Sequence, residues 1–270
     1  GWLLAGLLAL AGQQRAWAQG GGRQVAHYFV NWSGLALHQH FPPSDSLRAA
    51  RSGPVWGTGI DFDLRSSAPA YGSLRNPFRH LMRASARPWL HLTPRPGTRI
   101  SLSPLSYHFS GPTPRTREAA AGPGEHEWRI TLELKQGFGR PPGRLRHGIR
   151  FRYENRWARL AGAPRYTHIN RLRLRYSLRL ALGRAPVAAP KAAYALLANE
   201  IQLGFLEPSY VNLLAENRIY AGVGYRFTQD VQVELRYVQQ LSARQAVGNA
   251  WDAGHGLMLA VKLGQLVRRP

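Results

Sequence analysis

The chain has 270 residues, 36 Lys and Arg against 14 Asp and Glu, no Cys and a mean hydropathy of −0.32. The lack of Cys excludes a disulfide framework and a thiolate metal site. The low hydropathy argues against a helical membrane protein. A formal net charge of +22 first suggests a nucleic-acid binder. However, the arginines recur at every second residue inside apolar stretches, which indicates one face of a sheet, so we expect no nucleic-acid partner.

The beginning of the chain has the pattern of a signal peptide. Gly1 to Gly12 form an apolar run too short to span a bilayer, and the small-residue cleavage pattern Ala16-Trp17-Ala18 follows. Because the usual preceding basic segment is missing, we interpret residues 1–18 as an N-terminally truncated signal peptide. Residues 19–270 are expected to form one exported domain, since no linker divides them.

The first half of that domain shows irregular alternation. Apolar and polar residues alternate with the period of two that marks a half-buried strand over residues 25–40, 57–65, 80–92, 99–109 and 126–136. In the last of these stretches, Trp128, Ile130, Leu132 and Leu134 oppose Glu127, Arg129, Glu133 and Lys135. We expect five strands here.

The middle of the chain alternates most clearly. The stretch 144–157 has Leu145, Ile149, Phe151, Tyr153 and Trp157 on its apolar face, and the stretch 171–182 has Leu172, Leu174, Tyr176 and Leu178. The opposite faces of both stretches carry mainly arginine. A helix, with its period of 3.6 residues, would scatter these arginines around its circumference, so both stretches are predicted to be strands.

The last third adds strands at residues 200–205, 218–227, 231–237 and 257–263. About eleven strands are clear, and single-chain bacterial barrels usually have an even number. We therefore predict an all-β, transmembrane, antiparallel up-and-down β-barrel of about 12 strands (10–12) with an arginine-rich lumen. Short connections at 94–97 and 228–230 alternate with long ones at 111–125 and 241–255, and the long ones are expected outside the cell.

The arginine face is expected to point into the lumen, because an arginine facing lipid at the bilayer midplane costs about 2–4 kcal/mol. A soluble sandwich, whose polar face meets water, is the main alternative. The signal peptide and the aromatic residues near strand ends favour the barrel. Carboxylates on the same inferred faces, including Asp61, Asp63, Glu127 and Glu133, should pair with arginines. The predicted lumen charge network consists of Arg144, Arg146, Arg150, Arg152, Glu154, Arg156, Arg171, Arg173, Arg175, Arg179, Glu200, Arg218, Arg226, Glu234 and Arg236.

This excess of cations predicts a positive potential inside the barrel. Two roles stay open: a structural barrel filled by long side chains, which we favour, and a porin-like narrow channel for small polar or anionic solutes. The expected location is the outer membrane of a Gram-negative bacterium. The expected partners are outer-membrane lipid, the barrel-assembly machinery and, in the channel role, small anionic solutes.

An enzymatic alternative rests on His108 and Ser110. Some barrel lipid hydrolases and deacylases place a His and a Ser two residues apart, so that the imidazole activates the hydroxyl. The inferred alternation points both side chains toward the lumen rather than toward lipid, so we lean against an enzyme. No cofactor or metal site is expected; His38 and His40 are the only close pair of histidines on one face. Gly222 and Gly224 are expected to relieve crowding within a strand rather than to bind phosphate.

The second half of the chain resembles the bacterial outer-membrane barrel family catalogued as domain of unknown function 2490. The resemblance rests on residues 150–156 (RFRYENR), 173–176 (RLRY), 198–200 (ANE), 216–227 (ENRIYAGVGYRF) and 234–237 (ELRY), in this order and spacing. It implies an outer-membrane barrel of unassigned role. The family brings no catalytic residues to carry over.

Overall fold

The computed structural model describes residues 25–41, 54–67, 78, 80–111, 124–139, 143–159, 163–205, 214–243 and 251–265. All regular elements in these ranges are strands, which confirms the predicted all-β class. The described residues contain no helix that is long and apolar enough to cross a membrane. The expected signal peptide at 1–18 and most of the two long connections, at 112–123 and 244–250, lie outside the described residues.

The described chain forms eleven strands of 13 to 17 residues. Their bounds are β1 (Val25–Phe41), β2 (Val55–Ser67), β3 (His80–Arg95), β4 (Thr98–Ser110), β5 (Glu125–Phe138), β6 (Leu145–Arg159), β7 (Thr167–Ala181), β8 (Ala192–Phe205), β9 (Leu214–Arg226), β10 (Val231–Ala243) and β11 (Trp251–Gly264).

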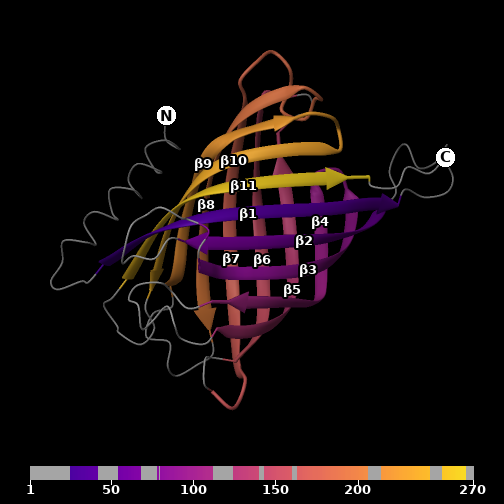
Figure 1. Ribbon diagram of the computed structural model, residues 1–270. Coiled ribbons are helices and arrows are strands. Elements are labelled where there is room, and N and C mark those ends of the chain that lie inside the picture. Colours follow the sequence, from indigo (N-terminus) through magenta and orange to yellow (C-terminus); the bar gives the residue numbers. More distant parts are fainter. Residues whose placement is uncertain are drawn as a thin grey trace.

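The strands close into a single barrel (Figure 1). Each strand pairs antiparallel with the next along the chain, and β1 and β11 complete the ring as a parallel pair in which Trp32 lies opposite Met258. The arrowheads of β1 and β11 point the same way in Figure 1. The eleven described strands lie within the predicted range of 10–12 and are one fewer than the expected twelve, because the long first stretch is one strand of 17 residues. With an odd number of alternating strands, the closing pair must be parallel.

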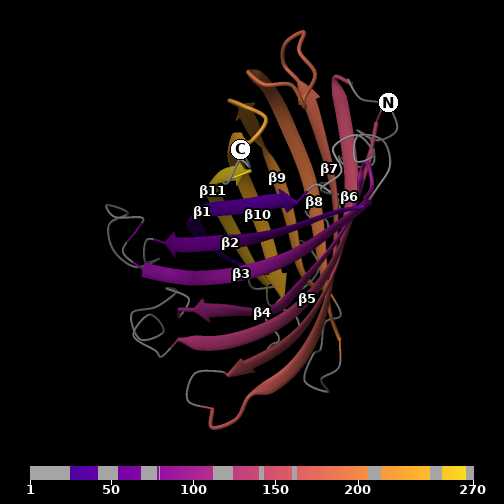
Figure 2. The ribbon, with the colours of Figure 1, turned by 90° about the vertical axis from the view of Figure 1, so that its right-hand side faces the viewer.

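The predicted alternation of short and long connections holds only in part (Figures 1 and 2), because residues 42–54 join β1 to β2 at the same end of the barrel as the short β3–β4 and β9–β10 turns. We call the end where β3 meets β4 and β9 meets β10 the turn rim, and the opposite end, where β4 precedes β5, the loop rim. At the turn rim, Gly97 has a φ of 86°, which glycine adopts without strain, and this permits the two-residue turn Pro96-Gly97. In the β9–β10 turn, the Thr228 hydroxyl accepts hydrogen bonds from the backbone N–H groups of Asp230 and Val231. Both predicted short turns are confirmed.

The two faces of the strands differ sharply. On β6, Phe151 and Tyr153 are exposed on the outer surface, whereas Arg152 and Glu154 are buried in the interior. The same alternation repeats on β5, β7 and β8. The interior also contains an apolar cluster on the wall formed by β1 and β8 to β11, which consists of Trp32, Ala198, Tyr220, Val238, Met258 and Ala260.

The glycines of β9 make room for bulky neighbours, as predicted. A Cβ atom on Gly224 would lie 2.3 Å from the Tyr194 ring, and one on Gly222 would lie 2.2 Å from the carbonyl oxygen of Leu235. Either contact is far closer than van der Waals distance, so both positions require glycine.

Candidate functional site in the lumen

A cavity of about 620 Å³ occupies the lumen on the side of the turn rim. Its lining includes four carboxylates, those of Asp61, Asp63, Glu133 and Asp230. It also includes seventeen cationic side chains: Arg65, Arg83, Arg87, Arg99, Arg129, Lys135, Arg146, Arg150, Arg152, Arg171, Arg173, Arg175, Arg179, Arg218, Arg226, Arg236 and Lys262. An enclosed surface with this charge balance attracts anions.

A second cavity of about 310 Å³ lies toward the loop rim, and Trp32, Arg65 and Arg83 line both cavities. These three residues define a waist between the two spaces. At the waist, the guanidinium carbon of Arg65 lies 3.5 Å from the centre of the Trp32 ring, and that of Arg218 lies 5.3 Å away. The indole therefore contacts two cations, and cation–π attraction stabilises both contacts.

The strand register creates rows of like charge that must be neutralised. Arg152 lies opposite Arg173 across β6 and β7, and Arg150 lies opposite Arg175. Directly opposed like charges destabilise a sheet. Glu154 on β6 and Glu200 on β8 lie close to these arginines and reduce the repulsion between them.

Glu154 is the most connected of these carboxylates and has no exposed surface. It accepts ion pairs from Arg171 at 2.5 Å and Arg173 at 2.9 Å, and Arg129 and Arg152 approach to 3.5 and 3.7 Å. The four arginines come from β5, β6 and β7. One buried carboxylate thus joins three neighbouring strands from inside the barrel.

Two further buried carboxylates extend the network. Glu200 pairs with Arg173 at 2.5 Å, with Arg218 at 3.6 Å and with Arg150. Glu133 accepts a 2.8 Å hydrogen bond from Arg152 and a 2.7 Å contact from Lys135. Such charge-assisted forks fix the interior side chains in place.

The network ends in smaller groups near each rim. Toward the loop rim, Arg129 donates to both oxygens of Glu127 at 2.5 and 2.6 Å, and Arg156 pairs with the same carboxylate. On β9 and β10, Arg218 pairs with Glu216, and Arg236 pairs with Glu234.

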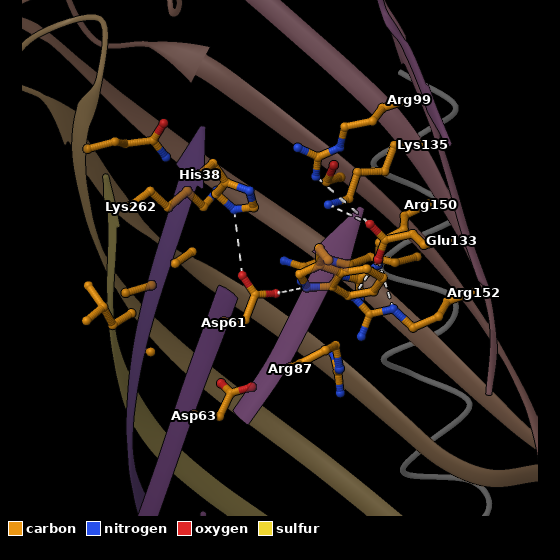
Figure 3. A pocket seen from close by; sticks show the side chains of 18 of the residues that line it. His38, Asp61, Asp63, Arg87, Arg99, Glu133, Lys135, Arg150, Arg152 and Lys262 are labelled. Atoms are coloured by element: carbon orange, nitrogen blue, oxygen red, sulfur yellow. Dashed lines mark hydrogen bonds and ion pairs between the residues drawn. The ribbon is translucent and has the colours of Figure 1, made fainter. Parts of the chain in front are cut away.

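A separate hydrogen-bonded chain crosses the wall formed by β1 to β4. Asp61 lies 3.6 Å from His38, whose other ring nitrogen lies 3.0 Å from His91, and His91 bonds Ser101 at 2.9 Å. Figure 3 shows His38 and Asp61 between Lys262 on one side and Arg99, Lys135 and Arg150 on the other. The histidine that His38 contacts is therefore His91, on β3, rather than its close neighbour in sequence, His40.

Most residues of the predicted network line this lumen, but the details differ. Arg144 precedes β6 and is exposed at the turn rim, outside the cavity lining. Among the described residues, no arginine forms a fork with Asp61 or Asp63; their carboxylates accept hydrogen bonds from the indole N–H groups of Trp89 at 2.7 Å and Trp32 at 2.8 Å. The predicted network omitted seven cations that line the cavity: Arg65, Arg83, Arg87, Arg99, Arg129, Lys135 and Lys262. Their position on the same inferred strand faces was the signal that could have identified them.

The structure does not assemble the His108 and Ser110 pair. His108 is 1% exposed and bonds Ser106 at 3.1 Å, because residues two apart on a strand share one face. Arg83 and Arg87 each lie 3.4 Å from a ring nitrogen of His108. Ser110 instead lines the cavity near the loop rim. With both ring nitrogens engaged, the imidazole is not placed to activate Ser110.

Among the described residues, no three His, Asp or Glu side chains gather into a metal-binding group. Comparison with curated proteins gives no match. Among solved structures, the chain is similar to "Outer-membrane expressed OmpT of Vibrio cholerae", with 12% sequence identity and a TM-score of 0.33 over 75% of this chain; it spans 60% of that protein's length.

A family profile described as protein of unknown function (DUF2490) matches residues 53–250, well over half of the chain. That match contains the RFRYENR, RLRY and ENRIYAGVGYRF segments on β6, β7 and β9. The protein is a β-barrel member of the DUF2490 family.

Proposed function

We propose that the protein is an outer-membrane barrel whose cationic lumen admits small anions and forms a narrow, anion-selective channel. The observation that carries this proposal is the lining of the larger cavity, in which seventeen cations outnumber the four carboxylates of the lining together with the five carboxylates behind it, Glu127, Glu154, Glu200, Glu216 and Glu234. Ion selectivity in a pore follows the sign of the charges that line it, so this lining favours anions over cations.

The outer surface supports a membrane location. Large apolar side chains cover the outward faces of neighbouring strands, among them Leu132 and Leu134 on β5, Ile149 and Phe151 on β6, and Leu174 on β7, each between 40% and 51% exposed. A protein in water rarely leaves so continuous an apolar surface uncovered. In this proposal, the apolar surface contacts outer-membrane lipid, and the barrel-assembly machinery inserts the chain.

The interior argues for a channel that is narrow rather than wide. Buried ion pairs fill the wall around Glu154 and Glu200, whereas the two cavities leave room for small solutes on either side of the waist. Arg65 and Arg83 at the waist keep its charge positive. Passage would therefore be limited by the waist and open only to small anions.

Reversal potentials test the selectivity. The purified protein is inserted into a planar bilayer with a tenfold KCl gradient. The expected reversal potential has the sign for preferential chloride passage, because the fixed charges of the lumen exclude potassium. A cation-selective potential would contradict the proposal. Complete absence of conductance from properly folded protein would leave only the structural barrel.

The waist itself is tested by paired tryptophan variants. Trp32→Ala removes the inward indole at the waist and should raise single-channel conductance several-fold. Trp56→Ala is the matched control, because Trp56 points outward and is 59% exposed. Equal conductance in the two variants would show that the waist does not limit passage.

A further inference from the structure

Four cations on one wall of the larger cavity are poorly compensated. Arg175 and Arg179 lie on β7, Arg236 lies on β10 and Lys262 lies on β11. All four line the cavity, and we call them the β7–β11 cation cluster. Lys262 is in electrostatic reach of Arg179, Arg236 and Arg175, so the members of the cluster repel one another.

The nearby carboxylate neutralises only part of this charge. Glu234 pairs with Arg236 and lies 3.4 Å from Arg179. It also accepts hydrogen bonds from Tyr194 at 2.7 Å and Gln232 at 2.6 Å. Glu200 lies opposite Arg175 across β7 and β8, but Arg150, Arg173 and Arg218 already share it, so the four cations of the cluster keep a positive excess. Within the described residues, Arg175 and Lys262 have no carboxylate within ion-pair distance.

At the level of the cluster, the strand register places a glycine on β9. Arg179, Leu196, Gly222 and Arg236 occupy one row across β7 to β10, so β9 contributes no side chain at this level. Arg236 is 5% exposed, and its Nε–H group, like that of Arg179, has no hydrogen-bond partner among the described residues. Buried donors without partners are costly unless a ligand satisfies them.

The chemistry of the cluster identifies the kind of ligand. A chloride or a simple carboxylate supplies one negative charge and leaves most of the excess unbalanced. Phosphate and pyrophosphate supply two or more charges and several oxygens that match the donor forks of arginine. The ammonium of Lys262 adds a point charge, and Figure 3 shows it facing the same space as Arg99, Lys135 and Arg150.

We propose that the β7–β11 cation cluster binds a soluble, multivalent oxyanion of the phosphate class inside the lumen. This inference rests on the proposed function of the lumen as an anion-selective channel, and it adds the class of anion that the lumen binds. A lipid phosphate is not the expected occupant, because the strand wall separates the cluster from the outer surface.

Calorimetry on the full chain in detergent micelles tests the site, with sodium pyrophosphate as the probe and little chloride present. Pyrophosphate should bind more tightly than phosphate, and phosphate more tightly than chloride. Lys262→Gln should weaken pyrophosphate binding about tenfold. Because this change also relieves repulsion, the thermal midpoint should stay equal or rise. Arg175→Gln serves as the second variant if Lys262→Gln does not fold.

Arg184→Gln is the matched control, since Arg184 is exposed in the β7–β8 connection, outside the cavity lining. Pyrophosphate binding no tighter than chloride binding would overturn the proposal, and so would equal losses in Lys262→Gln and Arg184→Gln. Competition by phosphatidylglycerol added to the micelles would reassign the site to a lipid headgroup.

Calorimetry and bilayer conductance test the two proposals separately, so that one can be refuted without the other. Chloride conduction without pyrophosphate binding would remove the oxyanion site and leave the channel. Pyrophosphate binding without any conduction would remove the channel and leave a barrel that holds oxyanions in a closed lumen.

Discussion

At the scale of single residues, the interior is organised by carboxylates that each serve several arginines. Glu154, Glu200 and Glu133 are at most 1% exposed and lie between like-charged arginines of neighbouring strands. A buried arginine with no counter-charge is strongly unfavourable, whereas a shared carboxylate neutralises several at once. The inward position of these carboxylates was predictable from the period of two. Their partners were not, because the partner depends on the register between strands far apart in sequence.

Glu154→Gln tests this role of the carboxylates. The amide keeps the shape of the side chain but removes the negative charge shared by Arg171 and Arg173. The free energy of unfolding, measured by urea titration of the protein in micelles, should therefore fall by about 3–5 kcal/mol. Glu125→Gln, at the exposed start of β5, is the control and should change stability by less than about 1 kcal/mol. If the two variants unfold alike, the shared carboxylate does not hold the interior together.

At the scale of strands, β9 shows how much a sequence pattern can reveal. Its alternation and its two glycines were both visible in the segment ENRIYAGVGYRF. The pattern predicted that the glycines relieve crowding, and the structure identifies the neighbours as the Tyr194 ring and the backbone of β10. The neighbours themselves were hidden, because β8 and β10 meet β9 through pairings that no local pattern specifies. On β4, alternation places Ser106 and Ser110 on the same face as His108, and only the structure shows that the imidazole bonds Ser106.

A pair of glycine variants tests the packing of β9. Gly222→Ala places a Cβ atom 2.2 Å from the Leu235 carbonyl oxygen, so the strands must separate locally and stability should fall by about 1–3 kcal/mol. Gly183→Ala, in the β7–β8 connection, meets no atom within 4 Å and should be close to neutral. The stability of both variants is measured as the temperature at which half of the protein shifts from the folded to the unfolded band on a gel. A neutral Gly222→Ala would mean that β9 and β10 are less closely packed than described.

At the scale of the whole molecule, the closed barrel has a polar, mostly cationic interior and an apolar outer surface. The sequence was sufficient to predict the all-β class, one polar and one apolar face, and the two short turns between β3 and β4 and between β9 and β10. The alternation indicated about eleven strands, and the usual even number of strands raised the expected count to about twelve. The parallel closure between β1 and β11 was not predictable, because alternation describes each strand alone. The cavities were not predictable from the sequence either, since they depend on which long side chains pair with one another across the lumen.

The central claim is that the arginine-bearing face encloses an aqueous lumen while the opposite face meets lipid. The chain has no cysteine, so single spin labels can be placed at neighbouring positions on β7. Ser177 lines the larger cavity, and Leu178 points outward. In lipid vesicles, power-saturation measurements should show the label at Ser177→Cys reached by a polar nickel complex and the label at Leu178→Cys reached by dissolved oxygen. The reverse pattern, or equal accessibility at both positions, would contradict this architecture.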